Sequence, residues 1–200
     1  MALTTKETYR YQDFKLKDKA PFFEITSLKV ATYCVANQNE ISDYYKIYWV
    51  ENGTGTYQID FKEFTIAGTG IFCLSPGQIF TIKNEKVKSA YQIAFDKDFY
   101  CVETHGKEIA CNGLLFNNVH RATAISLEAA DTPIFQQLVN SLINELENPG
   151  AAHRSMLETY LRMILIQALR KLDEQQPELE KEEDAHHRLT NDFIALVDKH

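Results

Sequence analysis

The chain has 200 residues and a mass of 23.0 kDa, enough to bury one sizeable core without disulfides. Hydrophobic residues make up 44% and aromatic residues 12%, which excludes collagen-like, low-complexity and disordered chains. The formal net charge of −7 has the wrong sign for a domain that holds a phosphate backbone over its whole surface, so we expect no binding of nucleic acid through bulk charge.

The cysteines and the N-terminal residues indicate a cellular compartment. The four cysteines form no C-x-x-C pair, and the first ten residues include no apolar segment that could act as a signal. No window approaches the ~18 to 20 apolar residues that would span a bilayer. We therefore expect a cytoplasmic protein with reduced thiols and no membrane role.

Short β-rich segments fill the first half of the chain. Five of the eight glycines fall within residues 53–77, and we interpret them as turns between strands. Seven short strands at near-even spacing favour a sandwich or a small barrel. The expected strands are 22–35, 44–51, 54–60, 62–67, 70–75, 78–83 and 88–96.

Alternation of side chains assigns faces in two of these strands, since successive residues point to opposite sides. The odd-numbered set is expected to face the interior, although Tyr48 leaves strand 44–51 ambiguous. The odd-numbered residues are Tyr45, Ile47 and Trp49 in one strand and Tyr91, Ile93 and Phe95 in the other.

The hydrophobic period changes to a helical one after residue 130. Asp131-Thr132-Pro133 predicts the start of a helix over 133–147, which Pro149-Gly150 ends. A second helix is predicted over about 153–172, and it is apolar on more than one side. The apolar sides of the second helix are covered either by the first helix alone, or by the first helix together with a second copy of the chain. The residues expected at a dimer interface are Leu157, Leu161, Ile164, Leu165, Ala168 and Leu172.

The last part of the chain begins with an acidic segment. Residues 173–188 hold seven acidic and two basic side chains, typical of a solvated linker or an exposed helix. Residues 189–200 predict a third amphipathic helix, which either docks back on the barrel or begins a further domain.

Motifs that would carry chemistry are missing from the sequence. The six histidines form no H-x-H or H-x-x-x-H pair, and there is no G-x-S-x-G. The glycine pairs lack the G-K-[ST] of a phosphate-binding loop. We therefore assign no catalytic and no metal-ligating residue, and we do not expect an enzyme.

Four segments resemble a known family. KIYWVENGTGTYQID (46–60) and SPGQIF (75–80) resemble the cupin barrel at the N-terminus of AraC-type transcription regulators. FYCVETHGKEIACNGLLFN (99–117) is similar to the segment after that barrel, and LTNDFIALVDKH (189–200) is similar to the first helix of the family's helix-turn-helix domain.

This resemblance implies a mainly β chain with C-terminal helices (α+β), a cupin-like double-stranded β-barrel followed by an α-helical dimerisation pair. The implied division is a sensory barrel over 1–125, a helical dimerisation segment over 126–175, and over 176–200 an acidic linker with the start of a DNA-binding domain that would continue past residue 200. Metal-binding cupins place a glutamate at the position of Lys46 and a histidine at that of Phe80. Because an ammonium and a phenyl ring do not ligate a cation, no metal or other cofactor is expected.

The resulting hypothesis is a ligand-sensing and dimerisation region that binds a small effector and controls a DNA-reading domain, as a homodimer. The expected ligand-binding residues are Tyr45, Trp49, Tyr57 and Tyr91, because each joins an apolar ring to a polar group; packing is the alternative for each of them. Two other functions stay open, a metal-free cupin-fold isomerase or epimerase, and a structural dimer module without an effector.

Overall fold

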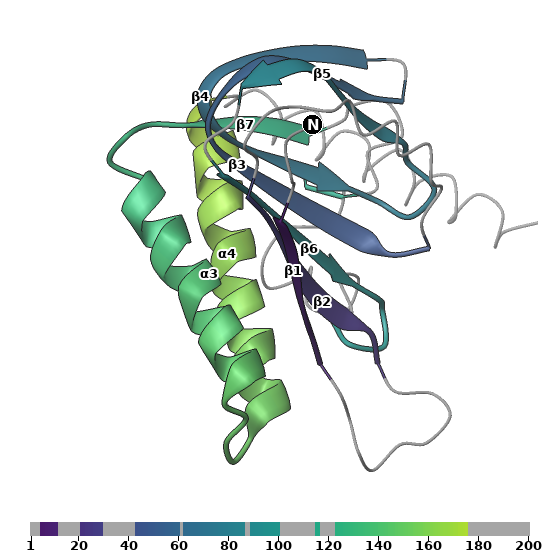
Figure 1. The fold of residues 1–200 in the computed structure, drawn as a ribbon, viewed down its shortest axis with the longest axis vertical. Helices are drawn as coiled ribbons and strands as arrows, with labels where there is room; N and C mark the ends of the chain where they lie inside the picture. Colours follow the sequence, from purple (N-terminus) through teal and green to yellow (C-terminus); the bar gives the residue numbers. More distant parts are fainter. Residues whose placement is uncertain are drawn as a thin grey trace, which may run out of the picture.

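The computed structural model describes residues 5–11, 21–29, 43–60, 62–86, 89–100, 115–116 and 123–175. In these ranges, strands precede two long helices, and the expected mainly β fold with C-terminal helices is confirmed (Figure 1). The elements are β1 (Thr5–Arg10), β2 (Phe23–Lys29), β3 (Tyr45–Ile59), β4 (Lys62–Leu74), β5 (Phe80–Lys86), β6 (Ser89–Phe95), β7 (Thr123–Leu127), α3 (Thr132–Glu147) and α4 (His153–Gln175).

The described strands form one antiparallel sheet. Its order is β1-β2-β6-β3-β4-β7, and β5 pairs with β3 beside this path. Every pairing between these strands is antiparallel. The first half of β3 pairs with β6 and its second half with β5, while β4 pairs along both halves. β3 is therefore the strand that connects all parts of the sheet.

Two long strands replace four of the short strands expected from the sequence. β3 includes both 44–51 and 54–60 apart from their end residues, and β4 joins 62–67 to 70–75. Gly53 pairs with Gly68 inside this ladder, so the interpretation of these glycines as turns is wrong. A glycine in a strand also permits a bulge or close approach, which spacing alone does not distinguish from a turn. Gly77, with φ of +87°, does lie in a turn.

A β-bulge in β3 changes the direction of the strand. Val50 pairs with Gly70 and Gly53 with Gly68, so Glu51 and Asn52 together face the single residue Thr69. The backbone N–H of Asn52 donates to Thr69 Oγ1 at 3.3 Å, and Asn52 has φ of +48°. Asparagine tolerates this left-handed conformation better than most residues. Such a bulge bends a strand and shifts its side-chain alternation by one residue.

The bend is large enough to bring distant residues of β3 together. In a straight strand, at about 3.3 Å per residue, Tyr48 and Tyr57 would lie about 30 Å apart. Both rings nevertheless contact Phe80, with ring centroids 4.3 Å and 6.1 Å from it. The two halves of β3 therefore fold over one another, and Tyr48 and Tyr57 share a face although one number is even and the other odd.

The two helices match the predicted ranges closely. Asp131 precedes α3 and Pro133 lies in its first turn, as expected. The Asp131 side chain, however, makes no capping hydrogen bond; it accepts from the Glu128 N–H at 3.1 Å and pairs with Lys171 of α4 at 3.0 Å. The hydrogen bond to Glu174 is the largest cause that raises the pKa of Lys171 above its ordinary value, and the hydrogen bond to Asp131 is the second.

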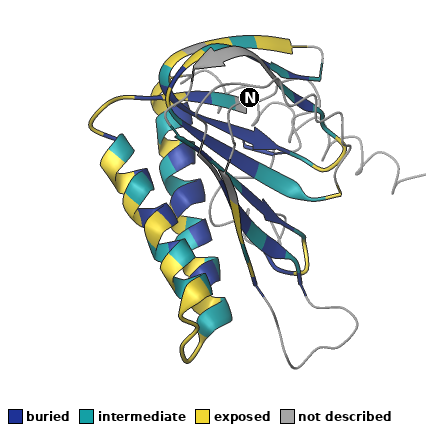
Figure 2. Cartoon of the chain, in the orientation of Figure 1, coloured by how far each residue is buried: buried dark blue, intermediate teal, exposed yellow. Residues whose placement is uncertain are grey.

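A large hydrophobic core, the helix-side core, lies between the helices and one face of the sheet. Phe23, Ile25, Ile71 and Ile93 of the strands pack in the same cluster as Leu142 of α3. Figure 2 shows the buried residues of α4 along the side that faces the sheet. The predicted dimer interface is therefore wrong, because its six residues, each at most 3% exposed, are covered by the chain's own core: Leu157, Leu161, Ile164, Leu165, Ala168 and Leu172.

Some expectations fall outside the described residues. These are the end of the strand predicted over 22–35, most of the segment 99–117, nearly all of the acidic linker 173–188 and the helix predicted over 189–200. The division proposed after residue 125 falls inside β7, and it stays a prediction. Within the described ranges, no helix has the length and apolarity needed to cross a membrane.

The bulge yields a stability prediction. Asn52→Val is expected to lower the free energy of unfolding by about 1 to 2 kcal/mol, because a β-branched residue is strained at positive φ. Asn52→Gly, the control, should stay within about 0.5 kcal/mol of the wild type. Urea denaturation followed by circular dichroism measures both values. Equal losses in the two variants would contradict the assigned backbone conformation.

Candidate functional site

The four tyrosine and tryptophan residues expected to bind a ligand do not line one site. Tyr45, Trp49 and Tyr91 lie at the helix-side core, whereas Tyr57 belongs to a second core formed by other strand residues. The bulge explains the separation, since odd-numbered residues before it and after it point to opposite faces of β3. The expectation that odd-numbered residues form the interior set holds for the helix-side core only.

In the helix-side core, aromatic residues that are paired across β3 and β6 also stack on one another. Trp49 of β3 is paired with Tyr91 of β6, and their rings stack with centroids 5.4 Å apart. Tyr45 stacks on Phe95 at 5.5 Å and meets Phe116 edge-on at 5.2 Å. Such pairs stabilise a sheet and account for most of these side chains without a ligand. The indole N–H of Trp49 is nevertheless buried without a hydrogen-bond partner.

The second core contains four rings that are joined through Phe80, which contacts the other three, and we call them the aromatic cluster: Tyr48, Tyr57, Phe72 and Phe80. Tyr57 lies 4.4 Å from Phe72 between ring centroids, and Phe72 lies 5.2 Å from Phe80. Phe80 in turn lies 4.3 Å from Tyr48. The remaining buried members are aliphatic: Val50, Ile59, Leu74 and Ala90.

Sequence reasoning identified one member of the aromatic cluster, Tyr57, and missed the other three. Alternation alone leaves the face of Tyr48 ambiguous, and it assigns neither Phe72 nor Phe80 to a ligand site. The Asn52-Gly53 dipeptide was the available signal, because this pair is typical of positions that need a positive φ. Read as a bulge inside one strand rather than as a turn, it would have placed Tyr48 and Tyr57 on one face.

Tyr57 has the most unusual environment in the aromatic cluster. The residue is 0% exposed, and its hydroxyl has no hydrogen-bond partner among the residues that the structure describes. Burying a hydroxyl without a partner costs about 1 to 3 kcal/mol. A small molecule that offered a donor or an acceptor to this oxygen would recover that free energy.

The described members of the aromatic cluster offer few reactive groups. Among its described members, the side-chain polar groups are the two tyrosine hydroxyls. Phe80, at the position where the resemblance implies a ligating histidine in metal-binding cupins, is 7% exposed and surrounded by rings. Lys46, at the implied glutamate position, is half-buried and pairs with Leu74 and Ala94. This donor set does not fit a divalent cation.

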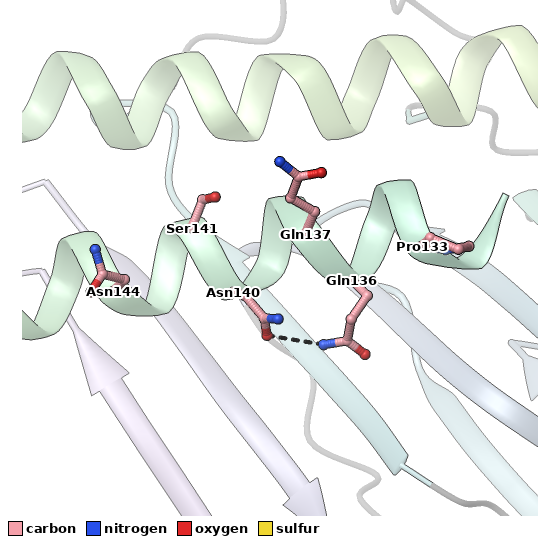
Figure 3. A pocket seen from close by; sticks show the side chains of 6 residues that line it. All are labelled: Pro133, Gln136, Gln137, Asn140, Ser141 and Asn144. Atoms are coloured by element: carbon pink, nitrogen blue, oxygen red, sulfur yellow. Dashed lines mark hydrogen bonds between the residues drawn. The ribbon is translucent and has the colours of Figure 1, made fainter.

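A separate feature lies on the outer side of α3. A surface hollow of about 500 Å³ follows the helix and is lined largely by side-chain amides (Figure 3). Gln136 Nε2 donates to Asn140 Oδ1 at 3.0 Å within it. The first thirteen residues of α3, 132–144, contain no charged side chain. The lining residues are Pro133, Gln136, Gln137, Asn140, Ser141 and Asn144.

Comparisons with known proteins give structural likenesses only. No protein-family profile and no curated protein matches the chain. It is similar to the crystal structure of the AraC-like transcriptional activator CuxR, at 10% identity and a TM-score of 0.42, covering 84% of this chain and 61% of that one. It is also similar to the Schizosaccharomyces pombe Cnp3 cupin domain, at 11% identity and a TM-score of 0.29, covering 56% of this chain and 72% of that one. It is also similar to the crystal structure of a cupin 2 conserved barrel domain protein from Rhodopseudomonas palustris, at 7% identity and a TM-score of 0.29, covering 68% of this chain and 93% of that one.

These structures are of the two kinds that the sequence resemblance named, an AraC-like regulator and cupin domains. This chain spans 61% of the length of the activator.

The unpartnered hydroxyl predicts the outcome of a conservative substitution. Tyr57→Phe should leave the free energy of unfolding unchanged or raise it by about 1 kcal/mol, because the variant removes a buried oxygen that has no partner. Tyr57→Leu, which also removes ring contacts, should lower it by about 2 to 3 kcal/mol. Thermal and urea denaturation measure both variants. A loss above about 1 kcal/mol for Tyr57→Phe would mean that the hydroxyl is hydrogen-bonded in the folded protein.

Proposed function

We propose that this chain is the effector-sensing and dimerisation region of an AraC-type transcription regulator. The aromatic cluster receives a small molecule, and the outer side of α3 forms the contact between two subunits. A DNA-reading domain continues past residue 200 in this proposal. The observation that carries it is the buried Tyr57 hydroxyl, which has no hydrogen-bond partner in the described part of the chain and whose ring contacts Phe72 and Phe80.

The lining of the cluster indicates the chemical class of the effector. Rings and aliphatic side chains favour a compact, largely apolar molecule, and the tyrosine hydroxyl favours one neutral hydrogen-bonding group on it. A doubly charged anion would lose its hydration without a compensating charge from the described members of the cluster. We therefore propose an uncharged ring compound with a hydroxyl or carbonyl group.

The proposed mechanism is a shift between two packings of the aromatic cluster. An effector that binds one packing more tightly than the other increases the population of the first. Because β3 carries side chains into both cores, a change on the ligand side alters the strand that also supports the helices. The result is a different presentation of the DNA-reading domains in a dimer.

Support for dimerisation comes from the outer side of α3 rather than from α4. A helix surface that faces water normally carries charged side chains, and interface cores are depleted of them. The exposed residues Gln137, Asn140 and Asn144 of α3 are uncharged. An amide both donates and accepts, so a row of amides is complementary to its own copy across a two-fold axis. The neighbouring Ile134 is 46% exposed and would add apolar area.

The remaining parts of the proposal follow from the same residues. We propose that the chain performs no catalysis, since the described part of the aromatic cluster offers no acid and base pair within reach of one another. DNA contact is assigned to the further domain and not to this acidic chain. The cytoplasmic location, like the enzyme alternative of an isomerase or epimerase, stays a prediction that no observation favours.

An effector screen tests the proposal. At a concentration of 100 Kd, a ligand of the folded state stabilises it by about 2.7 kcal/mol, and the midpoint of thermal unfolding should rise by about 5 to 11 °C. The panel contains phenol, indole, benzyl alcohol, cyclohexanone, benzoate and arabinose. We expect neutral ring compounds to raise the midpoint and Tyr57→Phe to weaken their binding at least about tenfold, equal to 1.4 kcal/mol.

The controls separate the aromatic cluster from other binding surfaces. Tyr45→Phe, on the helix-side core, should leave the affinity unchanged. Two results contradict the proposed site: a panel without any stabilising compound, which favours the structural dimer module, or equal affinity for the wild type and Tyr57→Phe.

Sedimentation velocity tests the dimer face. Ser141→Glu places two carboxylates near a two-fold axis on α3 and should convert a dimer to a monomer while the circular dichroism spectrum stays unchanged. Thr159→Glu, at an exposed position of α4, introduces the same charge and should leave the dimer intact. A wild-type monomer at micromolar concentration, or equal behaviour of the two variants, contradicts this interface.

A further inference from the structure

The chain between β6 and the helices begins with a tightly bonded turn at Asp96. Its Oδ1 accepts from the Phe99 N–H at 2.7 Å, and its Oδ2 accepts from the Phe22 N–H at 2.9 Å. The Asp96 N–H itself donates to the Phe22 carbonyl at 3.0 Å. One carboxylate therefore ties together the end of β6, the residue before β2 and the turn that follows. A displacement of β6 must move this turn.

Arg154, in the first turn of α4, is bonded to the same turn. Its Nη2 donates to the carbonyl oxygens of Asp98 at 2.8 Å and Phe99 at 3.4 Å. The guanidinium also lies over the Phe99 ring, 5.8 Å from the centroid, while its Nε is held by Glu158 at 2.7 Å. Only arginine has enough donors in a rigid planar group to make these contacts together.

Neighbouring contacts extend this arrangement to α3 and to β1. His153 Nδ1 lies 2.9 Å from Glu145 Oε1 of α3, and the His153 ring stacks on Tyr11 at 5.5 Å. Tyr11 follows β1 and meets Phe99 edge-on at 5.5 Å. We call these residues the junction: Tyr11, Asp96, Phe99, His153 and Arg154.

The other end of α4 is fixed independently. Gln175 accepts from the Ser126 N–H at 3.2 Å and donates to the Ser126 carbonyl of β7. Lys171 pairs with Asp131 at the start of α3. α4 therefore connects two different strands, with the junction at one end and β7 at the other. A movement at the junction alone must tilt or shift α4 relative to β7.

Strand pairing connects the junction to the aromatic cluster. The ring of Tyr48 contacts Phe80, and Tyr48 pairs with Gln92 in the middle of β6. Two residues further along β6, Ala94 pairs with Lys46, next to the end of β6 and the Asp96 turn. A change in ring packing can thus pass from Phe80 to Tyr48, from β3 to β6 through their strand pairing, and from the end of β6 to the Asp96 turn.

We propose that Arg154 is the positioning residue that couples the aromatic cluster to the helix pair. This inference rests on the proposed function, because coupling matters only if the cluster senses a guest. Arg154 contacts no ligand in this proposal; it transmits the position of the Asp96 turn to α4. Without its bonds to the two carbonyl oxygens, α4 still packs on the sheet through the helix-side core, but its first turn no longer follows the Asp96 turn directly and its response to the sheet becomes smaller.

The test uses hydrogen exchange and no ligand, so a failed effector search does not affect it. Phe80→Leu alters the ring packing of the cluster from within. In the wild-type background, this variant should raise the exchange rates of backbone amides over 157–165 at least about tenfold. In the Arg154→Met background, the same change should raise them by no more than about twofold. Arg154→Met keeps the aliphatic stem and removes the donors and the charge.

Two controls make the result specific. Arg170→Met removes an exposed arginine from the same helix and should preserve the tenfold response. Phe80→Met, which conserves volume better, replaces Phe80→Leu if the latter does not fold. An equal response with and without Arg154, or no response of α4 in the wild-type background, overturns the proposal.

Discussion

The arrangement of this protein depends on one bulge in one strand. Glu51 and Asn52 occupy the space opposite a single residue of β4, and the strand turns back on itself at that point. Without the extra residue, alternation would place Tyr48 and Tyr57 on opposite faces, and Phe80 could not contact both rings. The bulge thus creates two cores from one pair of strands. One core holds four aromatic rings, and the other joins the sheet to the helices.

The sequence predicted the elements better than it predicted their faces. The strands between residues 22 and 96, the two helices and the ends of α3 followed from hydrophobic period and from Asp131, Pro133 and Pro149, whereas β1 and β7 were not predicted. The connection across Gly53 did not, because a glycine that ends a strand and a glycine that follows a bulge have the same local composition. For α4, an apolar stripe was correctly expected to be buried, but a sequence cannot state whether the covering surface belongs to the same chain. Leu161 and Leu165 are covered by the chain's own core.

For the candidate site, side-chain type could be chosen from the sequence, but the position of each side chain in the fold could not. Choosing side chains that join a ring to a polar group selected Tyr57 and Trp49, and the polar atoms of both are buried without partners. That criterion could not select Phe72 or Phe80, which lack a polar group and become neighbours of Tyr57 only through the fold. The junction was also inaccessible to sequence analysis, because Asp96 and Arg154 are brought together by the packing of α4 on the sheet.

The bond between Gln175 and β7 has a consequence for the behaviour of the folded protein in solution. β7 lies at the end of the sheet path, and Ser126 directs a backbone N–H and a carbonyl away from β4 toward the amide of Gln175. Unpaired groups of this kind on an outer strand are a template for the strand of another molecule. Among the described residues, the Gln175 side chain therefore occupies the two outward-facing backbone groups of Ser126, and pulling the end of α4 away from β7 would leave that N–H and that carbonyl open to a strand of another molecule.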